Sequence, residues 1–317
     1  MFLETFQISF SATVQVFVLA ACGYFAVRLK ALDDKGLDQL TSILVNLFLP
    51  CFAFIQLTQH FDFASYLLWW HLPLLYIAMA AVALALAAMV GFGFKGRQKN
   101  EFMALVGFQN CGNIPLVVVA ALFTGPTAHI LFVYIVLFIV GANILIWTLG
   151  VWLLLRGENK PMDLKKMINP PLLTTLLTLV LVAIGWAKYI PQPMLMPIEM
   201  LGNCALPIAM LTVGGSLAGL SLRRIQVGPA ILIVLTKLVL FPLLALVCVF
   251  SLNVDPLMGF LIVLEAAVPS AVTLSLICRH YNTDEEFVSE GVFVTHVASI
   301  ITVPLFLTLY LKYAGKF

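Results

Sequence analysis

The sequence has little charge: only 10% of its 317 residues are Asp, Glu, Lys or Arg, while 62% are hydrophobic and the mean hydropathy is +1.07. A soluble domain carries about 25% charged residues, and under half of its residues are apolar. The scarcity of charge therefore excludes an ordinary water-soluble globule. The net charge of +2 also provides no basic surface for nucleic acid, so we expect no nucleic-acid partner.

Several motifs are absent as well. No GxxxxGK[ST] loop occurs, which excludes ATP-driven transport by this chain alone, and the lack of HExxH and GxGD argues against an intramembrane enzyme. The six cysteines stand singly in apolar segments without any metal-ligand spacing, so we interpret them as packing residues. The N-terminus has no basic region ahead of its apolar stretch, and we expect no removable signal peptide. We predict no catalytic residue, metal site or cofactor.

What the sequence does contain is long runs without a charged residue. These runs are 5–27, 39–61, 63–94, 102–155, 167–187, 200–222 and 291–311. A helix needs about 20 apolar residues to cross a hydrocarbon core roughly 30 Å thick. With the longest run divided at Thr124-Gly125-Pro126, and with Lys237 and Glu265 accepted inside spans, we predict an all-α polytopic membrane protein with ten transmembrane helices. Their approximate ranges are 5–28, 36–59, 65–94, 100–123, 127–155, 167–189, 195–221, 227–252, 256–281 and 286–313.

The positions of Lys and Arg indicate the orientation. With the N-terminus outside, 13 of these residues fall at the cytoplasmic ends of helices, and only Lys188, Lys312 and Lys316 fall on the other side. Cytoplasmic loops of membrane proteins are enriched in basic residues. We therefore predict a multi-pass protein of the cell (inner or plasma) membrane with both termini on the non-cytoplasmic side.

The chain divides into two halves of five predicted helices each. A polar cytoplasmic linker, 156–166, separates a first repeat, 1–155, from a second repeat, 167–317. Because each half has an odd number of helices, the second half must enter the membrane in the opposite direction. Inverted repeats of this kind are typical of secondary transporters.

Short sequence matches between the halves agree with this division. The stretch Asn46-Leu-Phe-Leu-Pro50 in helix two corresponds to Asn203-Cys-Ala-Leu-Pro207 in helix seven, and Ile114-Pro115 in helix four corresponds to Val268-Pro269 in helix nine. The alternative interpretation is that these matches only reflect the frequent use of proline in membrane helices.

Helices four and nine are predicted to be broken. The segment Gly107–Pro115 combines two glycines with a proline, and Glu265–Ala271 contains Pro269 and Ser270. Proline removes a backbone donor and clashes with the preceding turn, and in lipid such a break survives only inside protein or beside a wet cavity. Two broken helices that cross at mid-membrane would present N-terminal ends to an anion and C-terminal ends to a cation.

The segment Asn110-x-Gly112-Asn113-x-Pro115, the two Asn-x-x-Leu-Pro stretches and the ten-helix layout resemble the auxin efflux carrier family over essentially the whole chain. The resemblance implies a fold shared with bile-acid/sodium symporters and an elevator-type alternating access. Helices 1, 2, 6 and 7 would form a scaffold, and helices 3–5 and 8–10 would form a mobile transport domain. The implied substrate is a small organic anion, such as a mono- or dicarboxylate or an auxin-like acid. The short central linker differs from the long loop of many auxin carriers and argues against auxin itself.

Three other functions stay open at this stage. One is a sodium-coupled symporter of larger, bile-acid-like amphipathic anions, which shares the implied fold. A channel and an intramembrane enzyme are more distant alternatives. The lipid bilayer and the organic anion are the expected partners, and a homodimer is an open alternative to a monomer.

The resemblance also implies where substrate binds. The substrate-binding positions that it implies are Asn110, Gly112, Asn113 and Pro115 in the first break. In the second break the position is Pro269, and Ser270, which follows it, is also a predicted substrate-binding residue. The second break has no asparagine, which departs from the first. Asn46 and Asn203 either face the substrate from the scaffold or hydrogen-bond the carbonyls that their prolines leave free.

Two charges are predicted inside the membrane. A carboxylate at the bilayer centre costs about 2.5–3.5 kcal/mol on insertion scales, so Glu265 is expected to be partnered or functional. The resemblance implies a coupling site for Na⁺ or H⁺ at Glu265, and the alternative is a structural ion pair with Lys237. Lys237 could instead be the counter-ion of a substrate carboxylate. Asn143 and His296 occupy corresponding places in the two halves and either complete an ion site or are packing residues.

Overall fold

The computed structural model describes residues 2–156, 169–220 and 226–314, and these residues form helices joined by short turns. Among them the only β-type contact is an isolated antiparallel bridge. The all-helical class predicted from the sequence is therefore confirmed. Apart from Arg156, the linker predicted at 156–166 lies outside the described residues.

Seven helical segments in the described part of the chain are long and apolar enough to cross a membrane. They are α1 (Phe2–Arg28); α2, η1 and α3 (Asp34–Ile43, Leu44–Phe48, Leu49–His60); α4 and η2 (His71–Val90, Gly91–Gly93); α7, η3 and α8 (Gly125–Leu145, Ile146–Gly150, Val151–Leu155); α10 and α11 (Gln192–Asn203, Ala205–Ala218); α12, η6 and α13 (Val227–Leu235, Thr236–Leu240, Phe241–Ser251); and α16 (Glu286–Ala314).

The other three predicted spans are built from shorter helices. These are α5 and α6 (Gly96–Gly107, Asn113–Leu122), α9 (Pro170–Ala183) followed by η5 (Ala187–Tyr189), and α14 and α15 (Pro256–Ala267, Thr273–His280). The ten-span count and the inverted repeat consequently stay predictions.

Local sequence explains where the short helices begin. The side chain of Asn169 accepts a hydrogen bond from the Leu172 amide and caps α9, whose first residue is proline. Asp255 caps α14 in the same way before Pro256. A capping side chain followed by proline is a common helix start, because the first amides of a helix have no partner within it.

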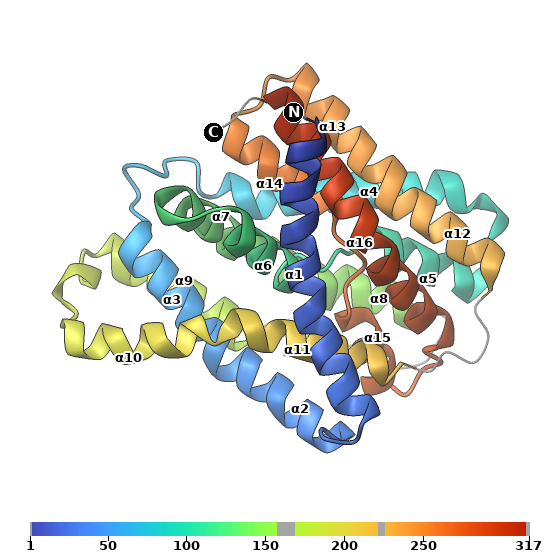
Figure 1. Cartoon of the computed structure of the whole chain (residues 1–317), viewed down its shortest axis with the longest axis horizontal. Helices are drawn as coiled ribbons and strands as arrows, with labels where there is room; N and C mark the ends of the chain where they lie inside the picture. The colour runs from blue at the N-terminus through green and yellow to red at the C-terminus, as the bar shows by residue number, and fades with distance from the viewer. Residues whose placement is uncertain (1, 157–168, 221–225, 315–317) are drawn as a thin grey trace.

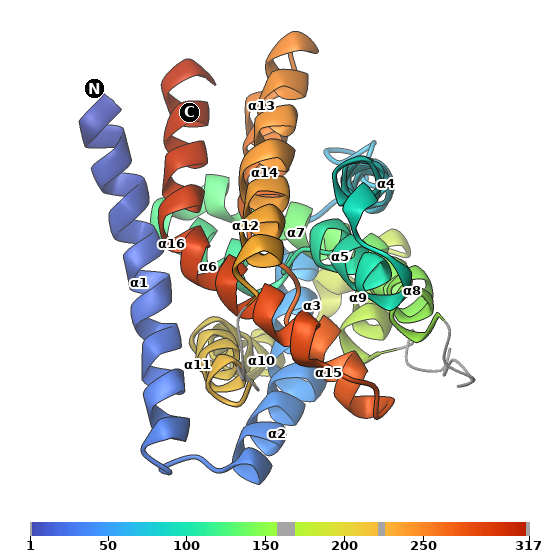
Figure 2. The same ribbon diagram turned by 90° about the vertical axis from the view of Figure 1, so that its right-hand side faces the viewer.

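The helix α1 runs along one side of the molecule, where it packs against α11 and α16 (Figure 2). Glycine makes the approach to α11 possible: a Cβ on Gly23 or Gly214 would overlap the backbone of the facing helix, at Leu211 or Ala20. In Figure 1, α3, α9 and α10 lie on the left, whereas α4, α5 and α12 lie on the right. The first residues of α1 and the last of α16 lie at the same end of the molecule.

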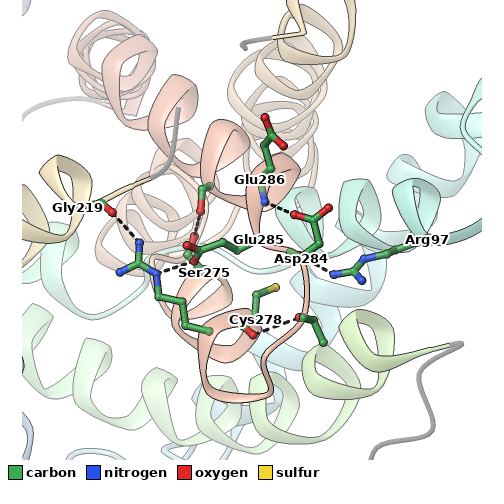
Figure 3. Close-up of polar contacts among 10 residues, drawn as sticks. Arg97, Gly219, Ser275, Cys278, Asp284, Glu285 and Glu286 are labelled. Carbon is green, nitrogen blue, oxygen red and sulfur yellow. Dashed lines mark hydrogen bonds and ion pairs between the residues drawn. The ribbon is translucent and has the colours of Figure 1, made fainter. Parts of the chain in front are cut away.

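A cluster of polar contacts lies at the opposite end, around the turn between α15 and α16 (Figure 3). Arg279 of α15 donates to the Glu285 carboxylate (2.6 Å) and to the carbonyl of Gly219 at the end of α11 (2.8 Å). Arg97 of α5 pairs with Glu101 (2.6 Å) and also donates to the Asp284 carbonyl. Basic groups at helix C-termini satisfy carbonyls that lack partners within the helix.

Candidate functional site

Two helices are unwound in the interior of the protein, and their unwound segments pair with each other. We call these segments, 108–112 between α5 and α6 and 268–272 between α14 and α15, the crossover. An antiparallel bridge joins Gln109 to Ser270. The Asn110 amide donates to the Pro269 carbonyl, and the Ala271 amide donates to the Phe108 carbonyl, both at 2.9 Å. Each break thus satisfies backbone groups of the other, which explains how non-helical backbone survives in an apolar interior.

Ser270 fixes this pairing from the side. Its hydroxyl donates to the carbonyl of Leu105 in the last turn of α5 at 2.6 Å, and its amide donates to the Thr295 hydroxyl at 3.3 Å. The Ser270 side chain is fully buried. It therefore satisfies a carbonyl that the end of α5 leaves without a helical partner.

A cavity of about 300 Å³ lies against the crossover. Residues of η1, α3, α6, α7, η3, α9 and α15 complete its walls. Most of the walls are apolar, and they include the aromatic side chains of Phe52 and Trp147. No charged side chain is present among the described residues that line it.

Two helix N-termini open onto this cavity. Asn113 is the first residue of α6, Thr273 is the first residue of α15, and both line the cavity. Neither helix has a side-chain cap at this end. The Leu274 and Ser275 amides of α15 already donate to the Ala271 and Val272 carbonyls. Since a helix N-terminus carries roughly half a positive charge, the two N-termini together still favour about one negative charge.

Gln109 contributes an amide that the protein leaves unsatisfied. Its side chain is fully buried, and the residue belongs to the lining of the cavity. Within the described part of the chain, neither its Oε1 nor its Nε2 has a hydrogen-bond partner. A buried amide group without a partner costs about 1–3 kcal/mol, and a bound water, ion or polar ligand would recover that free energy.

Asn110 is held in place by His296 of α16. The Nδ1 of His296 lies 2.8 Å from the Val292 carbonyl, so this nitrogen carries the proton and Nε2 is an acceptor. The Asn110 Nδ2 lies 3.4 Å from that Nε2. Since His296 is buried, it fixes the Asn110 amide without lining the cavity itself.

Asn143 and Asn169 form a second amide pair on the cavity wall. The Nδ2 of Asn169 donates to the Oδ1 of Asn143 at 2.9 Å, and both residues line the cavity. Asn169 also caps α9 through its own Oδ1, so its orientation is fixed at both ends of the amide. Among the described residues no hydrogen bond uses the Asn143 Nδ2, and this donor is the group that the pair offers to a ligand.

The structure thus gathers some of the predicted residues and separates others. Asn110, Gly112, Asn113 and Asn143 line the cavity, whereas Pro115, Pro269, Ser270, His296, Glu265 and Lys237 do not. Asn46 and Asn203 are exposed and lie outside its lining. The amide of Asn46 donates to Ser42 at 2.9 Å, one turn away on its own helix. Asn46 and Asn203 are therefore not part of the candidate binding site.

Several lining residues were not predicted from the sequence, and Gln109, Asn169 and Thr273 are polar ones beside the breaks or at a helix start. Gln109 lies between the glycines of the first break, so its position was a signal, but its burial could not be read from one sequence. Asn169 precedes two prolines, a capping signal that indicates only a helix start. Thr273 lies just beyond the predicted second break.

Known proteins of similar sequence are described as transporters. The profile of a family described as membrane transport protein matches residues 8–163 and 156–307. An uncharacterized transporter of Methanocaldococcus jannaschii is 23% identical over 295 residues, which cover 92% of this chain and 95% of the relative. An uncharacterized transporter of Methanothermobacter thermautotrophicus is 23% identical over 304 residues, which cover 95% of this chain and 98% of the relative. These matches indicate a transporter rather than an enzyme.

Proposed function

Because this chain belongs to the membrane transport protein family, that is, the auxin efflux carrier family, we propose that it is a secondary carrier of a small, apolar monocarboxylate. The carboxylate binds at the crossover, between the N-termini of α6 and α15, where Gln109, Asn110 and Asn113 offer amide groups. The apolar body of the substrate lies against the walls formed by α3, α7 and α9. The observation that carries this proposal is the unsatisfied Gln109 amide beside two uncapped helix N-termini.

The charge of the site favours one carboxylate over two. Two helix N-termini supply about one positive charge in total. The described lining contains no Lys, Arg or His that could pair with a second carboxylate. An unpaired carboxylate in apolar surroundings costs several kcal/mol or becomes protonated. A monocarboxylate therefore fits this site better than a dicarboxylate does.

The size of the cavity favours a small substrate. Ligand pockets in proteins span about 300–1,000 Å³, and this cavity is about 300 Å³, at the lower end. Phe52 and Trp147 offer flat apolar surfaces to an aromatic or aliphatic body. These features support a small organic anion over a bile-acid-like one.

An elevator-type motion is the second part of the proposal. The scaffold predicted from the family resemblance corresponds to α1–α3 and α9–α11, and the transport domain corresponds to α4–α8 and α12–α16. The cavity lies between these groups, because Phe52 and Leu172 line it from the scaffold while the crossover lines it from the transport domain. A crossover that slides past α3 and α9 would carry the anion across the membrane.

We further propose that both termini lie on the non-cytoplasmic side of the cell membrane. The positive-inside bias supports this orientation, as does the position of the first residues of α1 and the last of α16 at one end of the molecule (Figure 1).

Binding to the purified protein tests the proposed substrate class. Titration with octanoate, phenylacetate, indole-3-acetate, malate and malonate should give saturable binding with at least one monocarboxylate and with neither dicarboxylate. Asn113→Ala should weaken that binding, whereas Asn46→Ala, a matched change outside the cavity, should leave it unchanged. Tight binding of a dicarboxylate alone, or equal effects of the two variants, would contradict the proposal.

A further inference from the structure

Two amide side chains on the cavity wall are oriented in opposite ways. In the pair of Asn143 and Asn169, the Oδ1 of Asn143 accepts the hydrogen bond at 2.9 Å, so its Nδ2 is the end left for a ligand. In the pair of Asn110 and His296, the Nδ2 of Asn110 faces the histidine at 3.4 Å, so its Oδ1 is the end left. The cavity therefore has a donor from one asparagine and an acceptor from the other.

Backbone groups fix both orientations. The Oδ1 of Asn169 accepts from a backbone amide of α9, so its Nδ2 is the end that reaches Asn143. On the other side, the Nδ1 of His296 donates to the Val292 carbonyl at 2.8 Å, and the Nε2 of His296 is consequently an acceptor. An Asn110 amide in the reversed orientation would set its Oδ1 against this acceptor, with no hydrogen between them. The orientation of the Asn110 amide thus follows from a carbonyl of α16.

The Asn110 oxygen has no donor in the protein. The backbone of Asn110 is held in the crossover, because its amide donates to the Pro269 carbonyl at 2.9 Å. The residue is 6% exposed and lines the cavity, and among the described residues no hydrogen bond uses its Oδ1. The neighbouring Gln109 adds a second acceptor, since its Oε1 has no partner in the same part of the chain. Two acceptor oxygens at the crossover therefore lack a donor.

A plain carboxylate does not supply that donor. An ionised carboxylate only accepts hydrogen bonds, so it can use donors such as the Asn143 Nδ2 but leaves both acceptor oxygens unsatisfied. A hydroxyl group on the substrate supplies the missing donor and adds no charge to the site. An ammonium group would also donate, but it would place a positive charge beside two helix N-termini, which are positive themselves. The site therefore favours a hydroxyl.

We propose that the transported acid is an α-hydroxy monocarboxylate, and that His296 is the positioning residue that makes Asn110 select it. This inference rests on the proposed function and names its substrate more closely. A carboxylate and a hydroxyl on adjacent carbon atoms present an acceptor and a donor side by side. The Asn110 amide presents the matching pair: the Nδ2 hydrogen on the side of Oδ1 donates to the carboxylate, and Oδ1 accepts from the hydroxyl. The apolar body of the acid keeps its place against Phe52 and Trp147.

Two acids that differ by one hydroxyl test this inference. Mandelate is phenylacetate with a hydroxyl on the carbon next to the carboxylate, and the aromatic body is the same. Calorimetry with the purified wild-type protein should give a Kd about tenfold lower for the better-bound enantiomer of mandelate than for phenylacetate, as one added hydrogen bond predicts. Indole-3-acetate, whose N–H lies far from its carboxylate, should bind no more tightly than phenylacetate does.

The outcomes separate this inference from the proposed function. Binding of phenylacetate that is as tight as that of either mandelate enantiomer, or tighter, would overturn the inference and leave the proposed function intact. Tighter binding of indole-3-acetate than of mandelate would also overturn it, because the donor would then lie away from the carboxylate. No binding of mandelate, phenylacetate, indole-3-acetate or octanoate would contradict both.

His296→Leu tests the role of the histidine. Without the acceptor at Nε2 the Asn110 amide can turn, so the ratio of the two Kd values should fall from about tenfold to within about twofold. His71→Leu, a matched change at an exposed histidine outside the cavity lining, should keep the ratio. An equal loss of affinity for both acids in folded His296→Leu protein, which a merely structural role predicts, would overturn the assignment to His296. If this variant fails to fold, the wild-type ratio still decides the substrate class.

Discussion

At the scale of single residues, the site consists of amides whose hydrogen bonds are incomplete. Asn110 is held by His296, and Asn143 by Asn169, whereas Gln109 is fully buried with no partner among the described residues. A ligand that satisfies Gln109 recovers free energy that the empty protein has lost. Function at this position therefore opposes stability.

This opposition gives a prediction for Gln109→Leu. The variant should raise the free energy of unfolding of the ligand-free protein by about 1–3 kcal/mol, because it removes a buried amide that has no partner. It should also weaken acid binding at least tenfold, since a bond to a charged ligand group is lost. Thermal unfolding and calorimetry measure both effects. A less stable variant, or one with unchanged affinity, would contradict this view of Gln109, and Asn46→Ala should change neither quantity.

The sequence predicted only part of the site. Asn110, Gly112 and Asn113 follow from the glycines and proline around them, which indicate a break in an apolar helix. Asn46 and Asn203 share a pattern with each other, but the pattern does not tell which face of a helix turns inward, and both side chains are exposed. Burial depends on the packing of distant helices, which one sequence does not give.

At the scale of elements, the contact between α1 and α11 depends on two glycines. A Cβ on Gly214 would overlap the backbone of Ala20, and one on Gly23 would overlap that of Leu211. Backbone atoms cannot move aside as a flexible side chain does, so a larger residue must separate the helices.

We therefore expect Gly214→Val to destabilise the protein. Overpacking of a close interface costs about 1–3 kcal/mol, and here the clash is with backbone. Gly228→Ala in α12 is the matched control, because its added Cβ would meet no atom of another described element within 4 Å. The melting temperature in detergent should fall for Gly214→Val and stay nearly constant for Gly228→Ala. Equal melting temperatures of the two variants would contradict the close approach of α1 to α11.

Helix boundaries were predicted well where hydrophobic runs end in clear signals. The long helices α1 and α16 lie within a few residues of the ranges expected from the sequence. The prediction for α9 was too long, although Pro170-Pro171 at its start and Gly185 after its end mark its limits. Gly185 has a φ of +74°, which favours glycine. The π-helical turns η1, η3 and η6 were not predicted, because their extra residue depends on packing rather than on a local pattern.

At the scale of the whole molecule, Arg279 links the proposed scaffold to the proposed transport domain. It joins α15, in the proposed transport domain, to the end of α11, in the proposed scaffold (Figure 3). The Arg279 side chain is 41% exposed, so the contact is worth at most about 1 kcal/mol. A bond of this strength biases an equilibrium between two states without locking it.

Arg279→Ala should accordingly speed substrate exchange by up to about fivefold, because the state that this contact stabilises is left more readily. Arg97→Ala is the comparison variant, since the Arg97 contacts that the structure describes, with Glu101 and Asp284, lie within the proposed transport domain. Its exchange rate should stay within about twofold of wild type. A slower or unchanged rate for Arg279→Ala would contradict a motion between α11 and α15.

Composition together with the long charge-free runs predicted an all-helical membrane protein, and family membership shows a transporter. The pairing of the two breaks could not be predicted in this way, because Gln109 and Ser270 lie far apart in the chain. Proline and glycine predict that each helix is interrupted. Only the fold brings the interruptions together, so that one satisfies the backbone of the other.

The central claim is that the cavity at the crossover binds the transported monocarboxylate. Counterflow of radiolabelled acid into proteoliposomes loaded with unlabelled acid tests it directly, with the tightest-binding acid of the panel. We predict saturable counterflow by the wild type and by Asn46→Ala, and its loss in Asn110→Ala protein that is folded and inserted. Normal counterflow by Asn110→Ala, or a conductance with single-channel steps in place of saturation, would contradict the claim.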